Sequence, residues 1–107
     1  MFVHGNFSVE FDDRLLAHLQ VAIVRKFRRN ETLVMSWLDP LSVGDGRSSV
    51  WLTPNVPAYF KFYGSRVPRI NETWLQTLAD SANSSTGLVV TDEDGEFARA
   101  SGPVRVK

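Results

Sequence analysis

The chain has 107 residues, of which 43% are hydrophobic and 11% aromatic, and its acidic and basic residues balance to a net charge of zero. This composition predicts one globular domain with a real core and excludes a wholly disordered chain. The absence of cysteine excludes disulfides, thiolate metal sites and cysteine nucleophiles. No apolar run reaches the roughly 20 residues of a membrane helix, and no signal peptide is evident, so we expect a cytoplasmic protein without a membrane partner.

A β-hairpin and a long helix are predicted first. Gly5-Asn6 is a two-residue turn between strand-forming residues. Residues 12–29 then change to helical spacing, with Leu19 on the inward stripe and Asp12 as the N-cap. A polar stripe is expected on the water-exposed side of the same helix, formed by Arg14, His18, Arg25 and Arg29.

Three runs rich in strand-forming residues follow, at 32–38, 48–53 and 58–63, and their short links predict an antiparallel meander. Residues 71–83 predict a second helix, and residues 87–90 predict a last short strand. The expected fold class is therefore α+β. Its order is ββαβββαβ, a two-layer sandwich in which one mostly antiparallel sheet carries both helices on one face.

This domain is expected to span residues 1–90. Residues 91–107 form a C-terminal tail that is first acidic and then basic. The sequence leaves the structure of the tail open, since Asp94-Gly95 is suited to a hairpin turn and Thr91 is equally suited to cap a short helix.

The segment "VGDGRSSVW" (43–51) raises the question of a phosphate-binding loop. Its glycines are two residues apart, its basic residue is Arg47, and a strand follows in place of a helix. A nucleotide-binding loop needs a different spacing and a helix N-terminus. We therefore interpret Gly44-Asp45-Gly46 as the turn into the next strand.

Charge is unevenly distributed along the chain. Residues 14–69 contain nine basic and three acidic residues, a net charge of +6, and the remainder carries −6. A basic region of this kind attracts anions, so nucleic acid is one expected partner. The candidate phosphate-binding residues are the arginines at the end of the first helix and in loops: Arg25, Arg28, Arg29, Arg47, Arg66 and Arg69.

Aromatic residues are frequent in the predicted strands. Trp51, Tyr59 and Tyr63 are candidates for an exposed sheet face. Such a face is typical either of base stacking or of a contact between two copies of the chain, so a homodimer is the second expected partner.

The residues of a catalytic or metal site are sparse. His4 and His18 lie on different predicted elements, and "TDEDGE" (91–96) lacks the complete ligand pattern of a calcium loop. No metal site, no cofactor and no catalytic residue are therefore expected, and the protein is predicted not to be an enzyme.

A resemblance to a known family is carried by three segments: "FDDRLLAHLQVAIVRKFRR", "SWLDPLSVGDGRSSVWLTPNVPAYFKFYGSRVP" and "TWLQTLADSANSSTGL". They resemble small uncharacterised actinobacterial proteins, many of which carry the name ATP-dependent DNA ligase. The resemblance covers the chain up to about Val90 and implies a bacterial, cytoplasmic protein. Ligase chemistry needs a Lys-x-Asp-Gly motif. Here Lys61-Phe-Tyr-Gly64 has Tyr63 in place of the aspartate, so we do not expect ligase activity.

Three functions remain open from the sequence. The first is a small non-catalytic binding module that contacts nucleic acid through its arginines. The second is a homodimeric structural or regulatory protein that pairs through an aromatic sheet face or a strand edge. The third is an accessory role in DNA ligation, which rests on the resemblance alone.

Overall fold

The structure is a computed structural model, and it describes all 107 residues. A short 3₁₀ helix occupies Leu41–Val43, and no helix is long and apolar enough to cross a lipid bilayer. The remaining elements, in chain order, are β1 (Phe2–His4), β2 (Phe7–Val9), α1 (Asp13–Arg28), β3 (Leu33–Leu38), β4 (Arg47–Leu52), β5 (Ala58–Phe60), α2 (Glu72–Ala82), β6 (Leu88–Val89) and β7 (Arg105–Val106).

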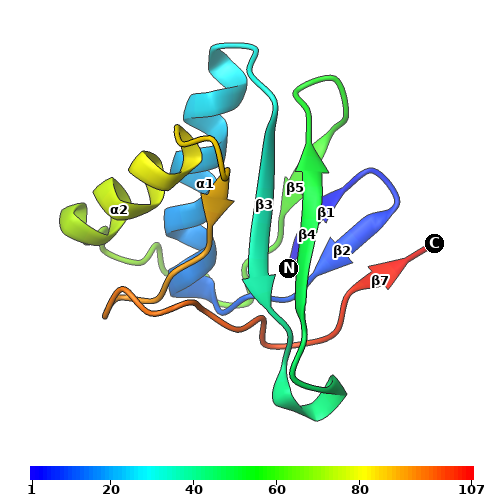
Figure 1. Cartoon of the computed structure of the whole chain (residues 1–107). Helices are drawn as coiled ribbons and strands as arrows, with labels where there is room; N and C mark the ends of the chain where they lie inside the picture. The colour runs from blue at the N-terminus through cyan, green and yellow to red at the C-terminus, as the bar shows by residue number, and fades with distance from the viewer.

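The α+β class predicted from the sequence is confirmed. The order of the elements up to β6 is the predicted one, and Figure 1 shows both helices on the same side of the strands. The helix α1 begins after Asp12, whose side chain accepts a hydrogen bond from the N–H of Leu15 at 2.9 Å. Asn71 caps α2 in the same way, through the N–H of Trp74.

The strands form two sheets, which corrects the expectation of a single one. One sheet has the order β5-β1-β2-β7 and is antiparallel throughout. The other has the order β4-β3-β6, in which β3 pairs antiparallel with β4 and parallel with β6.

The linker between β4 and β5 explains this division. It contains Pro54 and Pro57, which lack the N–H groups that a continuous meander would use. The strand β5 pairs with β1 in place of β4, with Phe60 opposite Phe2. One side of β4 is consequently left without a neighbouring strand.

A cluster of 20 buried residues joins both helices and both sheets into one core. Leu19, which its spacing placed in the core, is fully buried, and so is Trp37. The rings of Trp37 and Phe11 meet edge to face with centroids 5.7 Å apart. This contact packs β3 against the start of α1.

The polar stripe expected on α1 is only partly exposed. His18 is completely buried, and Lys26 is 8% exposed. The reason is that α2 packs along α1 and covers this side of the helix (Figure 1). The expectation that His18 faces water is therefore wrong.

Residues 91–107 pack against the rest of the chain. Ala98 and Ala100 are buried in the core, and the backbone of both residues is hydrogen-bonded to Leu38. The chain then ends in β7, which pairs with β2. A bridge between Thr91 and Phe97 closes a turn over the acidic segment.

Candidate interaction face and open strand edge

The six candidate arginines lie in separate regions of the molecule. Arg25, Arg28 and Arg29 are exposed in the last turn or just beyond the end of α1. Arg66 and Arg69 lie in the loop before α2, which contacts the first turn of α1. Because a helix of 16 residues is about 24 Å long, these two groups lie far apart.

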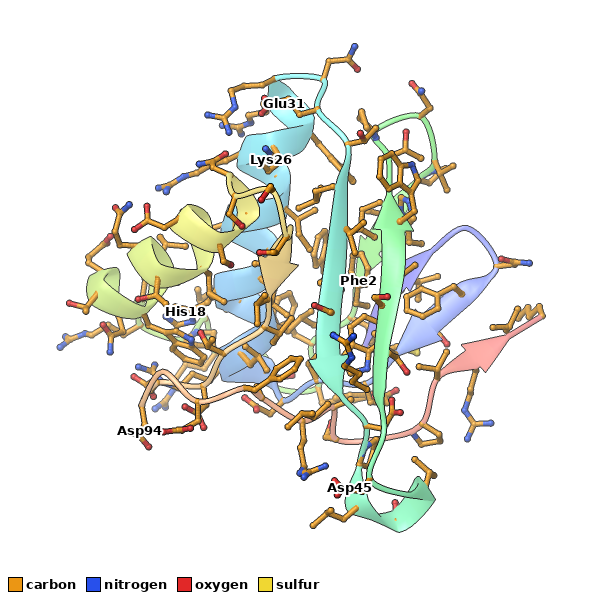
Figure 2. The ribbon with its side chains drawn as sticks, in the orientation of Figure 1. Phe2, His18, Lys26, Glu31, Asp45 and Asp94 are labelled. Atoms are coloured by element: carbon orange, nitrogen blue, oxygen red, sulfur yellow. The ribbon has the colours of Figure 1, made fainter.

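Arg47 occupies a third position, at the far end of the β3–β4 hairpin. It pairs with Leu38, the last residue of β3. Figure 2 shows Asp45, two residues before Arg47, at the opposite end of the molecule from Lys26 and Glu31. The six arginines therefore do not form one continuous surface.

The basic end of α1 is partly neutralised. Arg29 donates to Glu31 at 2.8 Å and to Asn83 at 3.0 Å. The buried ammonium of Lys26 contacts the same two side chains, Asn83 Oδ1 at 3.2 Å and Glu31 Oε1 at 3.3 Å. These contacts leave Arg25 and Arg28 as the arginines of this region without an ion pair.

The two candidate tyrosines are also separated. Tyr59 is exposed on β5, but the strand ends at Phe60, so Tyr63 does not share a sheet face with it. The expected strand stops early because the backbone N–H groups of Tyr63 and Gly64 bond to the carboxylate of Asp13. These bonds lower the pKa of Asp13, and the hydroxyl of Tyr63 is held by Glu10.

Trp51 lies on a different sheet, on the solvent-facing side of β4. Side chains alternate along β3 and β4, so that Leu33, Met35 and Trp37 point into the core. The opposite side, which we call the β4 face, is formed by Val34, Ser36, Leu38, Arg47, Ser49 and Trp51. Trp51 is 60% exposed, although large aromatic side chains are usually covered.

Two hollows lie on the β4 face and share Val34, and Trp51 lines the second of them. One, of about 360 Å³, is lined mainly by polar groups, among them Arg47, Ser36 and the hydroxyl of Thr86. The other, of about 220 Å³, lies between Trp51, Lys26 and the residues that follow α2. The β4 face is thus an uneven surface of hydroxyl groups around one exposed aromatic ring.

The backbone of β4 presents an unpaired edge beside this face. The N–H of Asp39 donates to the C=O of Gly46 at 2.9 Å, so these two residues form a hydrogen-bonded pair. Hydrogen-bonded and non-hydrogen-bonded pairs alternate along an antiparallel hairpin, which makes Leu38 and Arg47 the first non-hydrogen-bonded pair. By alternation, the N–H and C=O groups of Arg47, Ser49 and Trp51 point away from β3. No hydrogen bond within the chain uses them. We call these six groups the open edge.

A polar cluster at the start of both helices has a different character. His18 is buried and stacks on Trp74 with ring centroids 4.2 Å apart. Its Nε2 accepts from the N–H of Asn71 at 2.9 Å, so its Nδ1 carries the proton that it donates to the carbonyl of Arg14. The indole N–H of Trp74 donates to the carbonyl of Thr91 at 2.8 Å.

Glu93 completes this cluster from the loop after β6. It accepts two hydrogen bonds from Arg14 and one from Asn71, and the Arg14 bonds are the main reason that its pKa falls to about 2. Both ring nitrogens of His18 are engaged with backbone groups, and its ring is covered. The cluster therefore connects α1, α2 and the loop, and it offers no free acid or base to a substrate.

No three side chains among the histidines, aspartates and glutamates come together as a metal-ligand set would. The sequence identified Trp51 and Arg47 but missed Ser36, Ser49 and Thr86 as their neighbours. The proline pair at 54 and 57 was the available signal for the open edge, because it separates β4 from β5.

Comparison with known proteins places the chain in one family. Searches among curated proteins and among solved structures find no match. A domain family described as a domain of unknown function, DUF7882, matches residues 1–93, which include both helices and the strands β1 to β6. The chain therefore belongs to the DUF7882 family of domains of unknown function.

Proposed function

We propose that this protein is a small non-catalytic interaction module, which binds an extended polypeptide segment along the open edge of β4. The observation that carries the proposal is the position of Trp51. It is 60% exposed beside a row of unpaired backbone groups. Exposed strand edges bind extended chains by adding a strand, and neighbouring side chains supply the specificity.

The surroundings of β4 support this mode of binding. Proteins usually protect a strand edge with proline, lysine or a covering loop. The strand β4 contains no proline, and its one charged residue, Arg47, lies at the end of the strand. The three residues whose backbone groups point outward, Arg47, Ser49 and Trp51, are all exposed. Trp51 supplies the kind of aromatic anchor that is enriched in protein interfaces, and the hollow beside it can receive a side chain of the partner.

The experiment is a selection from a phage-displayed library of random linear peptides. We expect enrichment of peptides rich in strand-forming residues that bind the wild type but not Ser49→Pro or Trp51→Ala. Tyr59→Ala is the matched control, since it removes an exposed aromatic ring from the other sheet. Failure of a monomeric wild type to enrich any peptide, or equal binding to Ser49→Pro, would contradict the proposal.

A second candidate function is nucleic-acid binding at the end of α1. It is favoured because a groove between the two helices adjoins the hollow beside Trp51. Arg25 and Arg29 line a groove between the helices, and Lys26 and Asn83 line both this groove and the hollow beside Trp51. A single strand could place phosphates at the groove and stack one base on the indole. An accessory role in DNA ligation stays a prediction from the sequence resemblance.

A further inference from the structure

The open edge of β4 differs from the other strand edges of the protein in its length. The remaining edge strands, β5, β6 and β7, have three, two and two residues, whereas β4 has six. Only β4 has three residues whose backbone N–H and C=O groups point away from the sheet, and these are the alternate residues Arg47, Ser49 and Trp51. We propose that the segment bound at this edge is β4 of a second copy of the chain, an inference that rests on the proposed function.

The register of such a pair follows from the alternation along β4. In an antiparallel pair, the outward residues of one strand face the outward residues of the other. A two-fold axis at Ser49 is the arrangement that uses all three residues on both sides. Ser49 then faces its own counterpart, and Arg47 faces Trp51 of the second copy. All six backbone groups of each open edge find a partner.

The side chains of this register are complementary. Arg47 and Trp51 both point toward the β4 face, so across the new strand pair they are direct neighbours. A guanidinium over an indole is a favourable cation–π contact, and the symmetry creates it twice. At the centre, the two copies of Ser49 face each other, and neither carries a charge. Arg47 and Trp51 lie two residues before and two residues after Ser49, so a two-fold axis at Ser49 places each of them opposite the other.

The extent of the pair is also bounded by the sequence. Gly46 and the turn before it end the strand on one side, and Pro54 ends it on the other. The product is a continuous sheet in the order β6-β3-β4-β4-β3-β6. Since only five residues of each strand overlap, we expect a weak, reversible dimer that depends on protein concentration.

Two kinds of substitution at Ser49 test the pairing. Ser49→Pro removes the central outward N–H while leaving every β3–β4 hydrogen bond in place, because the N–H of Ser49 points away from β3. Ser49→Lys and Ser49→Glu keep the backbone intact and place like charges opposite each other at the two-fold axis. All three substitutions are at an exposed position, so we expect the fold to be retained.

The measurement is sedimentation equilibrium from about 1 µM to about 1 mM protein, the range of weak association. We expect the 12.0 kDa wild type to approach twice its mass as concentration rises. Ser49→Pro, Ser49→Lys and Ser49→Glu should each remain monomeric at concentrations where the wild type is paired. An equimolar mixture of Ser49→Lys and Ser49→Glu should pair again, because opposite charges then meet.

Tyr59→Lys, an equally exposed change on the other sheet, is the control and should pair like the wild type. The inference is overturned if the wild type stays monomeric, if the three Ser49 variants still pair, or if the charge mixture does not. A monomeric wild type that binds the selected peptides would overturn self-pairing and leave the proposed function standing. If neither peptides nor a second copy bind, the proposed function fails as well.

Discussion

Arg14 and Glu93, 79 residues apart in the sequence, meet in a two-point ion pair. Nε of Arg14 lies 2.7 Å from Oε1 of Glu93, and Nη2 lies 2.6 Å from Oε2. Arg14 also donates to the carbonyl of Arg69 at 2.8 Å. One guanidinium therefore joins α1 to the loop before α2 and to the loop after β6.

This pair predicts sensitivity to acid. The pKa of Glu93 is about 2 in the folded protein, against an ordinary value of 4.5, so folding stabilises the ionised form. Its contribution is complete above pH 4.5 and is lost as the pH falls toward 2. We expect Glu93→Gln to lower the melting temperature at neutral pH, and the difference from wild type to shrink in acid. Glu96→Gln, at an exposed position, should differ little from wild type at any pH.

A second pH dependence is expected from His4. Burial lowers its pKa below the ordinary value of 6.5, because the imidazolium form loses its hydration. The unfolded chain then binds the proton more readily, so stability should decrease as the pH falls below 6.5. Thermal unfolding of His4→Phe should lack this component, and an NMR titration of the wild-type ring should show the lowered pKa. A ring that titrates at or above 6.5 would contradict the prediction.

The core assignment can be tested with two leucines. Leu19 is fully buried on α1, whereas Leu41 is 68% exposed in the 3₁₀ helix. Leu19→Ala should lower the free energy of unfolding by about 2–5 kcal/mol, through lost burial and the cavity left behind. Leu41→Ala should change it by less than about 0.5 kcal/mol, as is usual at the surface. Chemical denaturation measures both, and equal effects would disprove the assignment.

Gly87 and Gly95 allow backbone strain to be separated from steric overlap. Both have positive φ, +80° and +83°. A Cβ on Gly87 would lie 2.4 Å from the carbonyl oxygen of Val34, whereas a Cβ on Gly95 would have no neighbour within 4 Å. Gly95→Ala should therefore cost about 1–2 kcal/mol of stability from strain alone. Gly87→Ala should cost clearly more, since β6 must move away from β3; comparable losses would argue against the close approach.

Oligonucleotide binding tests the second candidate function. If the end of α1 contacts nucleic acid, affinity should fall with salt by a log–log slope of roughly −0.7 to −0.9 for each phosphate. The double variant Arg25→Gln, Arg28→Gln should weaken binding to all sequences and make the slope shallower. Arg66→Gln, near the opposite end of α1, should have little effect. Fluorescence anisotropy with labelled single- and double-stranded oligonucleotides provides the measurement, and absence of binding at low salt would exclude this function.

Much of the local structure could be predicted from the sequence. The boundaries of α1 and α2 lie within one residue of the predicted ones, because Asp12 and Asn71 cap the helices through nearby backbone groups. The strand β3 was equally evident from its alternation of buried and exposed residues. These features depend on interactions between residues close in the chain, which sequence patterns report directly.

The sheet arrangement and the candidate site were decided by tertiary packing. Local pattern predicted β4 and β5 as neighbours, yet β5 pairs with β1 and leaves the open edge. His18 has the spacing of an exposed residue and is buried because α2, more than 50 residues later, covers it. The candidate arginines lie in one basic part of the sequence, but the fold separates them in space. Which strand pairs with which, and which side chain is covered, depend on contacts between distant residues, and the amino-acid pattern of a single element does not contain that information.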